Sequence, residues 1–122
     1  MSMRILVVED HEDNRQILRD LLGAAGYGMI EAHDGEAALE IVGGAKPDLI
    51  LMDIQLPGID RYEVTRRIRA TPELHKIPII AVTSFALSGD DAKARAAGCD
   101  DYVAKPYSPR QLLAKIRHYL SE

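Results

Sequence analysis

The chain has 122 residues, 47% of them hydrophobic and 28% charged, which suits one ordinary domain with a single core and is too short for two. A formal net charge of −4 argues against nucleic-acid binding, and no apolar run approaches the roughly 20 residues that a membrane span needs. The single cysteine excludes an intramolecular disulfide and there is no signal-peptide core, so we expect a cytoplasmic domain that binds neither nucleic acid nor membrane.

Short apolar runs without polar alternation recur along the chain. Such runs are typical of strands that are buried on both faces, as in a parallel sheet covered by helices. They occupy residues 5–8, 49–52 and 79–82, and more weakly 102–104. A poorer strand is predicted at 27–32, after Gly26.

Segments with helical spacing lie between these runs. Their apolar stripes are formed by Ile17, Leu18, Leu21, Leu22 and Ala25; by Ala38, Leu39, Ile41 and Val42; by Tyr62, Val64 and Ile68; and by Leu112, Leu113, Ile116 and Leu120. An alanine-rich segment at 90–97 predicts a further helix. Glycines at 26, 43–44 and 98 are predicted to end helices, and Ser108-Pro109 to begin the last one.

Strands and helices therefore alternate five times, which predicts an α/β fold with a doubly wound parallel sheet. Right-handed crossovers favour the strand order 2-1-3-4-5. We expect one domain over residues 1–122, with no output domain.

Polar side chains follow four of the predicted strands at the point where each strand ends: Glu9-Asp10, Asp53, Thr83 and Lys105. A single aspartate at such a place is usually a turn or helix cap. Four parallel strands, however, end at one edge of the sheet, where neighbours lie about 4.8 Å apart and such folds bind ligands. The coincidence predicts one shared site.

Three carboxylates this close repel one another unless a cation lies among them. Oxygen ligands of this kind suit Mg²⁺, with Mn²⁺ as a substitute. A metal-neutralised Asp53 can attack phosphorus and form an aspartyl phosphate, which Thr83 and Lys105 would stabilise. His11 lies beside the acidic pair, but no second histidine or cysteine is placed to join it in a transition-metal site.

The longer phrases around these residues resemble receiver domains of two-component response regulators from end to end. They run over residues 5–10, 47–58, 77–83 and 98–106, and include Leu51-Met52-Asp53 and Ala104-Lys105-Pro106. The local wording is nearest to stand-alone cell-division receivers of the DivK type and to the receivers of hybrid kinases. The resemblance implies a bacterial phosphoprotein with a flavodoxin-like (βα)5 sandwich.

The resemblance also implies a role for each site residue. Asp53 would accept the phosphoryl group from a histidine kinase or a histidine phosphotransfer protein. Glu9, Asp10, Asp53 and the backbone carbonyl of Gln55 would hold Mg²⁺, while Thr83 and Lys105 would contact the phosphoryl group and the peptide between Lys105 and Pro106 would be cis. Thr83 and Tyr102 would act as the switch, reporting phosphorylation to an effector on the face of the fourth helix, fifth strand and fifth helix, in a monomer or weak dimer.

The sequence also has features in common with other classes of protein. A phosphatase of the haloacid dehalogenase type also uses an aspartate and Mg²⁺, but it needs a second acid where this chain has Gln55. A pseudo-receiver scaffold usually loses the acidic pair or the lysine, and this chain keeps both. A receiver cut from a larger regulator or hybrid kinase is a further alternative. We favour a signalling switch over an enzyme, with only its own phosphorylation and dephosphorylation as chemistry.

Overall fold

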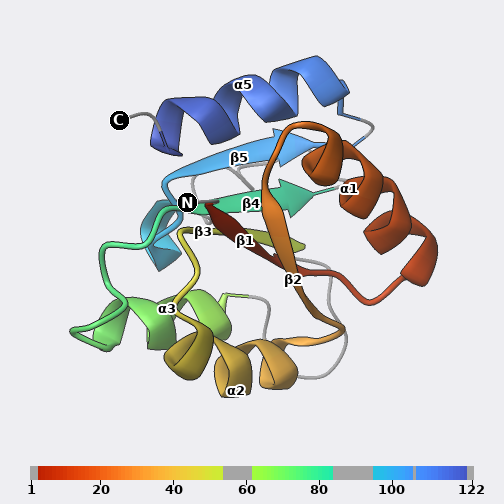
Figure 1. Ribbon diagram of the computed structural model, residues 1–122. Helices are drawn as coiled ribbons and strands as arrows, with labels where there is room; N and C mark the ends of the chain where they lie inside the picture. The colour runs from red at the N-terminus through yellow and green to blue at the C-terminus, as the bar shows by residue number, and fades with distance from the viewer. Residues whose placement is uncertain (1–2, 54–61, 84–94, 106, 121–122) are drawn as a thin grey trace.

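The computed structural model describes residues 3–53, 62–83, 95–105 and 107–120, and it has the predicted α/β architecture (Figure 1). Five parallel strands form one sheet in the order β2-β1-β3-β4-β5, which confirms the predicted topology. The strands are β1 (Arg4–Val8), β2 (Gly28–Ala32), β3 (Leu49–Asp53), β4 (Ile79–Thr83) and β5 (Asp101–Ala104). The helices with complete bounds are α1 (Glu12–Ala24), α2 (Gly35–Ala45), α3 (Glu63–Ala70) and α5 (Pro109–Leu120).

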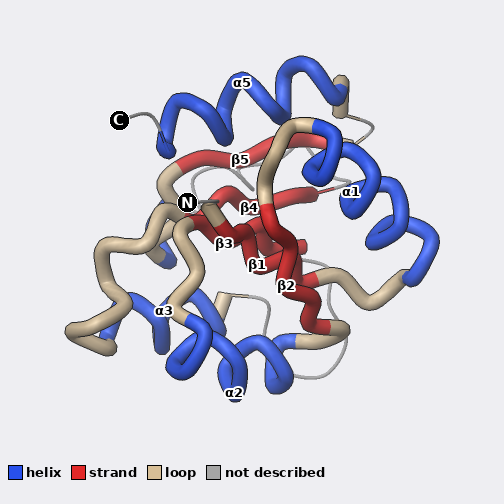
Figure 2. The backbone as a smooth tube through the Cα atoms, in the orientation of Figure 1, coloured by secondary structure: helices blue, strands red, loops and turns tan. Residues whose placement is uncertain are grey.

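The sheet divides the core into two layers (Figure 2). Alternate strand residues face opposite sides because successive side chains in a strand point in opposite directions. Ile50 and Met52 pack with α2 and α3, whereas Leu49 and Leu51 pack with α1 and α5. All four of these β3 residues are buried, which explains why the central strand has no polar alternation in its sequence.

Most of the predicted helix ends are confirmed. Gly26 and Gly98 have φ values of +90° and +116° directly after helical segments, where a residue without a Cβ is favoured. Ser108 precedes α5, and its hydroxyl accepts a hydrogen bond from the Gln111 amide at 3.4 Å. Of the predicted helix at 90–97, residues 95–97 are helical and the rest lies outside the described residues. No helix in the described ranges is long and apolar enough to span a membrane.

The prediction that Gly43-Gly44 ends a helix is wrong. Helix α2 runs through both glycines to Ala45 and is capped by Lys46, whose φ of +46° is left-handed. A glycine inside a helix costs only about 1 kcal/mol relative to alanine, and the buried Ala38 and Val42 anchor the helix against the core.

Ile17 also departs from its predicted place in the buried stripe of α1. Leu18 and Leu22 face the sheet and are buried, whereas Ile17 is 57% exposed. Consecutive helix positions lie about 100° apart, so the stripe centred on Leu18 turns Ile17 toward the rim of the helix. Among the described residues, Ile17 is the exposed large hydrophobic side chain.

Arg69 stabilises the amino edge of the sheet through hydrogen bonds to the segments before β4 and β5. Its guanidinium donates hydrogen bonds of 2.7 Å to the carbonyls of Gly98, His75 and Ile77, and one of 2.6 Å to Asp100. The same Asp100 carboxylate accepts the Ile79 amide at 2.8 Å. One side chain from α3 thereby joins the segments that lead into β4 and β5.

A second polar cluster joins β5 to α5. The Asp101 carboxylate receives Lys115 Nζ at 3.2 Å, the Tyr119 hydroxyl at 3.3 Å and the Tyr102 amide at 2.8 Å. Burial by itself raises the pKa of Asp101, but these donors outweigh it and lower that pKa below its usual value of 3.8.

Gly98→Ala should lower the free energy of unfolding by about 2 kcal/mol, because the added Cβ falls in a disfavoured backbone region. It would also lie 2.6 Å from Arg69 Cγ. Gly43→Ala is the matched control, since its Cβ meets nothing within 4 Å, and it should stabilise α2 by about 0.5–1 kcal/mol. Urea unfolding of both variants measures the difference. Equal stability of the Gly98→Ala variant and the parent protein would show that the position of Gly98 beside Arg69 does not require a glycine.

Asp101→Asn should cost about 1 kcal/mol at pH 7, as expected for a partly exposed charged hydrogen-bond cluster. A carboxylate with a lowered pKa adds stability that is fully present above its unfolded pKa of 3.8 and is lost as the pH falls through the folded value. The difference between variant and parent should therefore shrink below pH 3.8 in denaturant titrations. Lys115→Gln should behave alike, and the double variant should lose little more than either single one. A pH-independent difference would show that charge is not the cause.

Candidate functional site

The strand register brings the predicted acidic residues together at the carboxyl edge of the sheet. Val8 pairs with Met52 across β1 and β3, so Glu9 and Asp53, the residues that follow them, emerge side by side. Asp53 pairs with Val82 of β4, and Thr83 pairs with Ala104 of β5. Lys105 then follows β5 and approaches the acids from the far edge.

Lys105 bridges the two acids. Its Nζ lies 3.2 Å from Asp53 Oδ2 and 3.3 Å from Glu9 Oε1. Both carboxylates are buried, and the lysine side chain is 23% exposed. One ammonium group therefore serves two carboxylates that have been largely removed from water, which leaves the site with an excess of negative charge.

The electrostatics of the site reflect this sharing. Burial raises the pKa of Glu9, but the His11 amide, the contact with Asp53 and the Lys105 charge together lower it to about 2. Burial lowers the pKa of Lys105, and the charges of Asp53 and Glu9 reverse this effect and raise it. The direction for both groups favours the charged forms, so the pair is ionised at neutral pH.

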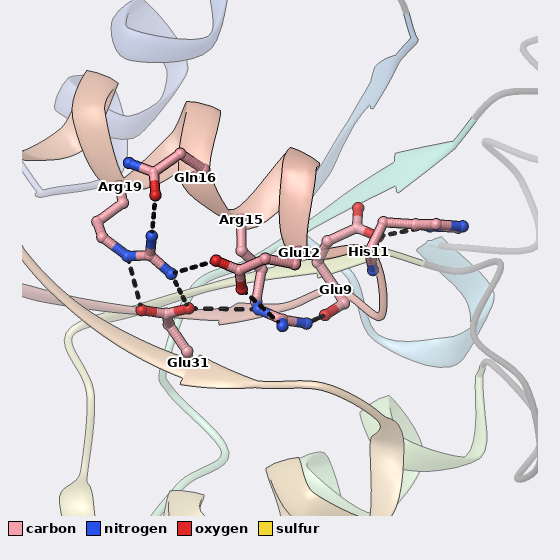
Figure 3. A network of polar contacts seen from close by, with 7 residues as sticks. All are labelled: Glu9, His11, Glu12, Arg15, Gln16, Arg19 and Glu31. Atoms are coloured by element: carbon pink, nitrogen blue, oxygen red, sulfur yellow. Dashed lines mark hydrogen bonds and ion pairs between the residues drawn. The ribbon is translucent and has the colours of Figure 1, made fainter.

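Asp10 and His11 complete the acidic end of the site. The His11 amide donates to Glu9 Oε2 at 3.0 Å, and the His11 ring Nδ1 lies 3.3 Å from that oxygen (Figure 3). The same ring nitrogen lies 3.1 Å from Asp10 Oδ1. Asp10 Oδ1 is buried, and because its contact with the His11 ring lacks hydrogen-bond geometry, it accepts no hydrogen bond from any described residue. Ligand atoms of Glu9, Asp10 and His11 all lie within 4.8 Å of one another. The His11 ring is exposed.

Several predicted site features lie outside the described residues. These are the Gln55 carbonyl, the peptide between Lys105 and Pro106, and the side chain of Thr83, whose backbone ends β4. Tyr102 is described: it lies in β5 in register with Ala81, is half-buried, and packs on the core layer of α2 and α3. The structure thus joins Glu9, Asp10, Asp53 and Lys105, with Tyr102 on the adjoining strand.

A hollow of about 460 Å³ opens beside Asp53 between α1 and α5. Its walls are mostly apolar and include Ile17, Leu18, Tyr107 and Pro109, while Asp53, Glu9 and Lys105 contribute polar atoms. The exposed Ile17 is therefore part of a continuous apolar surface that reaches the buried carboxylates. Such a surface suits contact with another molecule close to Asp53.

Three residues around the site were not predicted from the sequence. Asn14 and Tyr107 line the hollow, and burial raises the pKa of Tyr107 although Lys105 opposes it. Arg15 donates to the backbone carbonyl of Glu9 at 2.7 Å. The spacing of Glu12 and Arg15 suggests a surface ion pair on a helix and does not reveal the contact with Glu9.

Comparison with known proteins finds similar sequences and the same architecture elsewhere. The model of the response regulator receiver domain family matches residues 5–117. The polar-differentiation response regulator DivK of Brucella anthropi is 43% identical over 122 residues, covering 100% of this chain and 99% of the relative.

Two solved structures illustrate the likeness in three dimensions. The receiver domain of a Pseudomonas aeruginosa sensor histidine kinase, which has a magnesium ion coordinated in its active-site cleft, is 35% identical with a TM-score of 0.92 over the whole of both chains. A chemotaxis response regulator of Vibrio cholerae is 27% identical with a TM-score of 0.92, covering 98% of this chain and 100% of that one.

Lys105→Met should destabilise the protein by about 2 kcal/mol when a chelator is present, because it leaves two buried carboxylates without their ammonium partner. Lys46→Met is the control, since Lys46 lies 3.9 Å from Glu73 and both side chains are exposed. That change should alter stability by less than about 0.5 kcal/mol. Denaturant unfolding compares the two, and equal effects would mean that Lys105 does not neutralise the site.

Proposed function

The chain belongs to the response regulator receiver domain family, and we propose that it is a phosphorylation-controlled switch whose phosphoacceptor is Asp53. The observation that carries this proposal is the position of the Asp53 carboxylate. It is buried 3.2 Å from the Lys105 ammonium, at the edge of the sheet where a hollow opens to the surface. A nucleophile needs both this access and a nearby cation to take up a phosphoryl group.

In the proposed step, an Asp53 carboxylate oxygen forms a bond to phosphorus as the bond from phosphorus to the donor's histidine nitrogen breaks. The donor imidazole leaves with the electron pair of that bond and takes up a proton. Lys105 then turns from the carboxylates to the new phosphoryl oxygens, and the Thr83 hydroxyl donates a hydrogen bond to another of them. Only the chain's own phosphorylation and dephosphorylation belong to this chemistry.

The residues present fit a magnesium ion. Glu9, Asp10 and Asp53 supply hard carboxylate oxygens, the donors that Mg²⁺ prefers, and the buried Asp10 Oδ1 accepts no hydrogen bond from the described chain. Asp10 and Asp53 would hold the ion with the Gln55 backbone carbonyl, and Glu9 would assist. When bound, Mg²⁺ offsets the negative charge of the carboxylates and of the incoming phosphoryl group. The magnesium ion in the active-site cleft of the Pseudomonas receiver supports this assignment.

The phosphodonor in this proposal is a histidine kinase or a histidine phosphotransfer protein. Ile17 and the apolar walls of the hollow support docking of such a protein beside Asp53, because they offer an apolar contact surface next to the reactive group. A cytoplasmic location belongs to the same proposal, and the single buried cysteine is compatible with a reducing compartment.

The switch output in this proposal passes through Tyr102. The ring is half-buried on β5, and a shift of Thr83 toward the phosphoryl group would let it turn further inward. The surface of residues 95–97, β5 and α5 would then present a changed face to an effector protein. We propose a monomer or a weak dimer through this same face.

Incubation of the protein with Mg²⁺ and a small phosphodonor such as acetyl phosphate should add one acid-stable, base-labile phosphoryl group. Asp53→Asn should abolish the incorporation, because an amide oxygen is a far poorer nucleophile than a carboxylate. Intact-protein mass spectrometry measures the addition.

Asp48→Asn is the matched control. Asp48 lies just before the same strand, at the opposite edge of the sheet, where it accepts the Arg4 amide at 2.7 Å. An asparagine oxygen can keep that hydrogen bond, so phosphorylation of this variant should be unchanged. Absence of incorporation in the parent protein, or equal incorporation in Asp53→Asn, would overturn the proposal.

A further inference from the structure

A polar network joins the start of α1 to the edge strand β2 (Figure 3). Glu31 of β2 accepts hydrogen bonds from Arg19 Nε at 2.9 Å and Arg19 Nη2 at 2.6 Å, and its Oε1 lies 3.3 Å from Arg15 Nε. Glu12 accepts a hydrogen bond from Arg15 Nη2 at 2.8 Å. The two arginines therefore share the same acidic partners.

Only one of the two arginines reaches the acidic end of the candidate site. Arg15 Nη1 donates to the Glu9 carbonyl at 2.7 Å, and its side chain is only 16% exposed. Arg19 is directed toward Glu31, Gln16 and Glu12, and within the described part of the chain it makes no hydrogen bond or ion pair with Glu9. The two residues thus differ in one relevant contact.

Glu9 makes hydrogen bonds through its amide, its carbonyl and its side chain. Its amide donates to the Ala32 carbonyl at the end of β2 at 3.0 Å, its carbonyl accepts Arg15, and its side chain accepts the His11 amide at 3.0 Å. Loss of the carbonyl contact would free the peptide that leads from Glu9 into Asp10. That peptide sets the direction in which both carboxylates point.

We propose that Arg15 is a positioning residue that fixes Glu9 and Asp10 for binding of a divalent cation, and that it ties their geometry to edge strand β2. The inference rests on the proposed function, since it assumes a cation at these carboxylates. Arginine suits this role because its planar fork can hold a carbonyl and two carboxylates at once, whereas a lysine ammonium is a compact point donor on a flexible stem.

The direction of the change in Mg²⁺ affinity distinguishes a positioning role from a purely electrostatic one. Removal of a positive charge near a cation site favours the cation, so a purely electrostatic role predicts tighter binding of Mg²⁺ after neutralisation of either arginine. A positioning role predicts weaker binding, and only for Arg15. Loss of partners that orient metal ligands typically weakens metal affinity by about tenfold or more.

The experiment compares Arg15→Gln, Arg15→Lys and Arg19→Gln with the parent protein. Isothermal titration calorimetry with Mg²⁺ measures affinity, and amide hydrogen exchange of the metal-free proteins measures opening at residues 9–11. Arg15→Gln should bind Mg²⁺ about tenfold more weakly and exchange faster at the Glu9 and His11 amides. Arg15→Lys should recover part of the affinity, because lysine can still donate to the carbonyl.

Arg19→Gln is the matched control, since it removes the same charge and breaks the bidentate contact with Glu31. It should leave the Mg²⁺ affinity unchanged or slightly raised, with no faster exchange at residues 9–11. Equal or tighter Mg²⁺ binding by Arg15→Gln would overturn the inference, as would equal weakening by both glutamine variants. Failure of the parent protein to bind Mg²⁺ would instead count against the cation site of the proposed function.

Discussion

Glu9, Asp53 and Lys105 meet at one edge of a parallel sheet, and this meeting is the constraint that the rest of the structure has to satisfy. Two carboxylates are withdrawn from water there and share a single ammonium group, an arrangement that is unfavourable for folding unless the rest of the chain supports it. The support comes from two largely apolar layers and from β3, whose four residues before Asp53 are all buried. The stability of the apolar core thus offsets the cost of burying charged groups at this edge of the sheet.

The fold was predictable because its signals are local and strong. Uninterrupted runs such as Leu49–Met52 can be buried on both faces only within a covered parallel sheet, and five alternations leave few topologies. The same topology brings together Glu9, Asp10, Asp53 and Lys105, because parallel strands that begin at one edge must end at the other. The chemical roles of these four residues are part of the proposed function.

Other features were not predictable because they depend on tertiary contacts. Helix α2 continues through Gly43 and Gly44 because packing of Val42 outweighs the weak helix preference of glycine. Ile17 belongs to an apolar stripe in the sequence, yet the gap between α1 and α5 leaves it exposed. The contact of Arg15 with Glu9 joins a helix to a backbone carbonyl, and a carbonyl has no signature in the sequence. Gln55, the Thr83 side chain and Pro106 lie outside the described residues.

The position of Tyr107 has an optical consequence. The chain contains five tyrosines and no tryptophan, so its near-ultraviolet absorption and intrinsic emission come chiefly from phenol rings. Tyr107 lines the hollow and is close enough to Lys105, Glu9 and Asp53 for their charges to act on its hydroxyl. A change in the charge of these neighbouring groups alters the electric field at the Tyr107 ring. The protein therefore carries its own spectroscopic reporter beside the carboxylates, and no brighter indole obscures it.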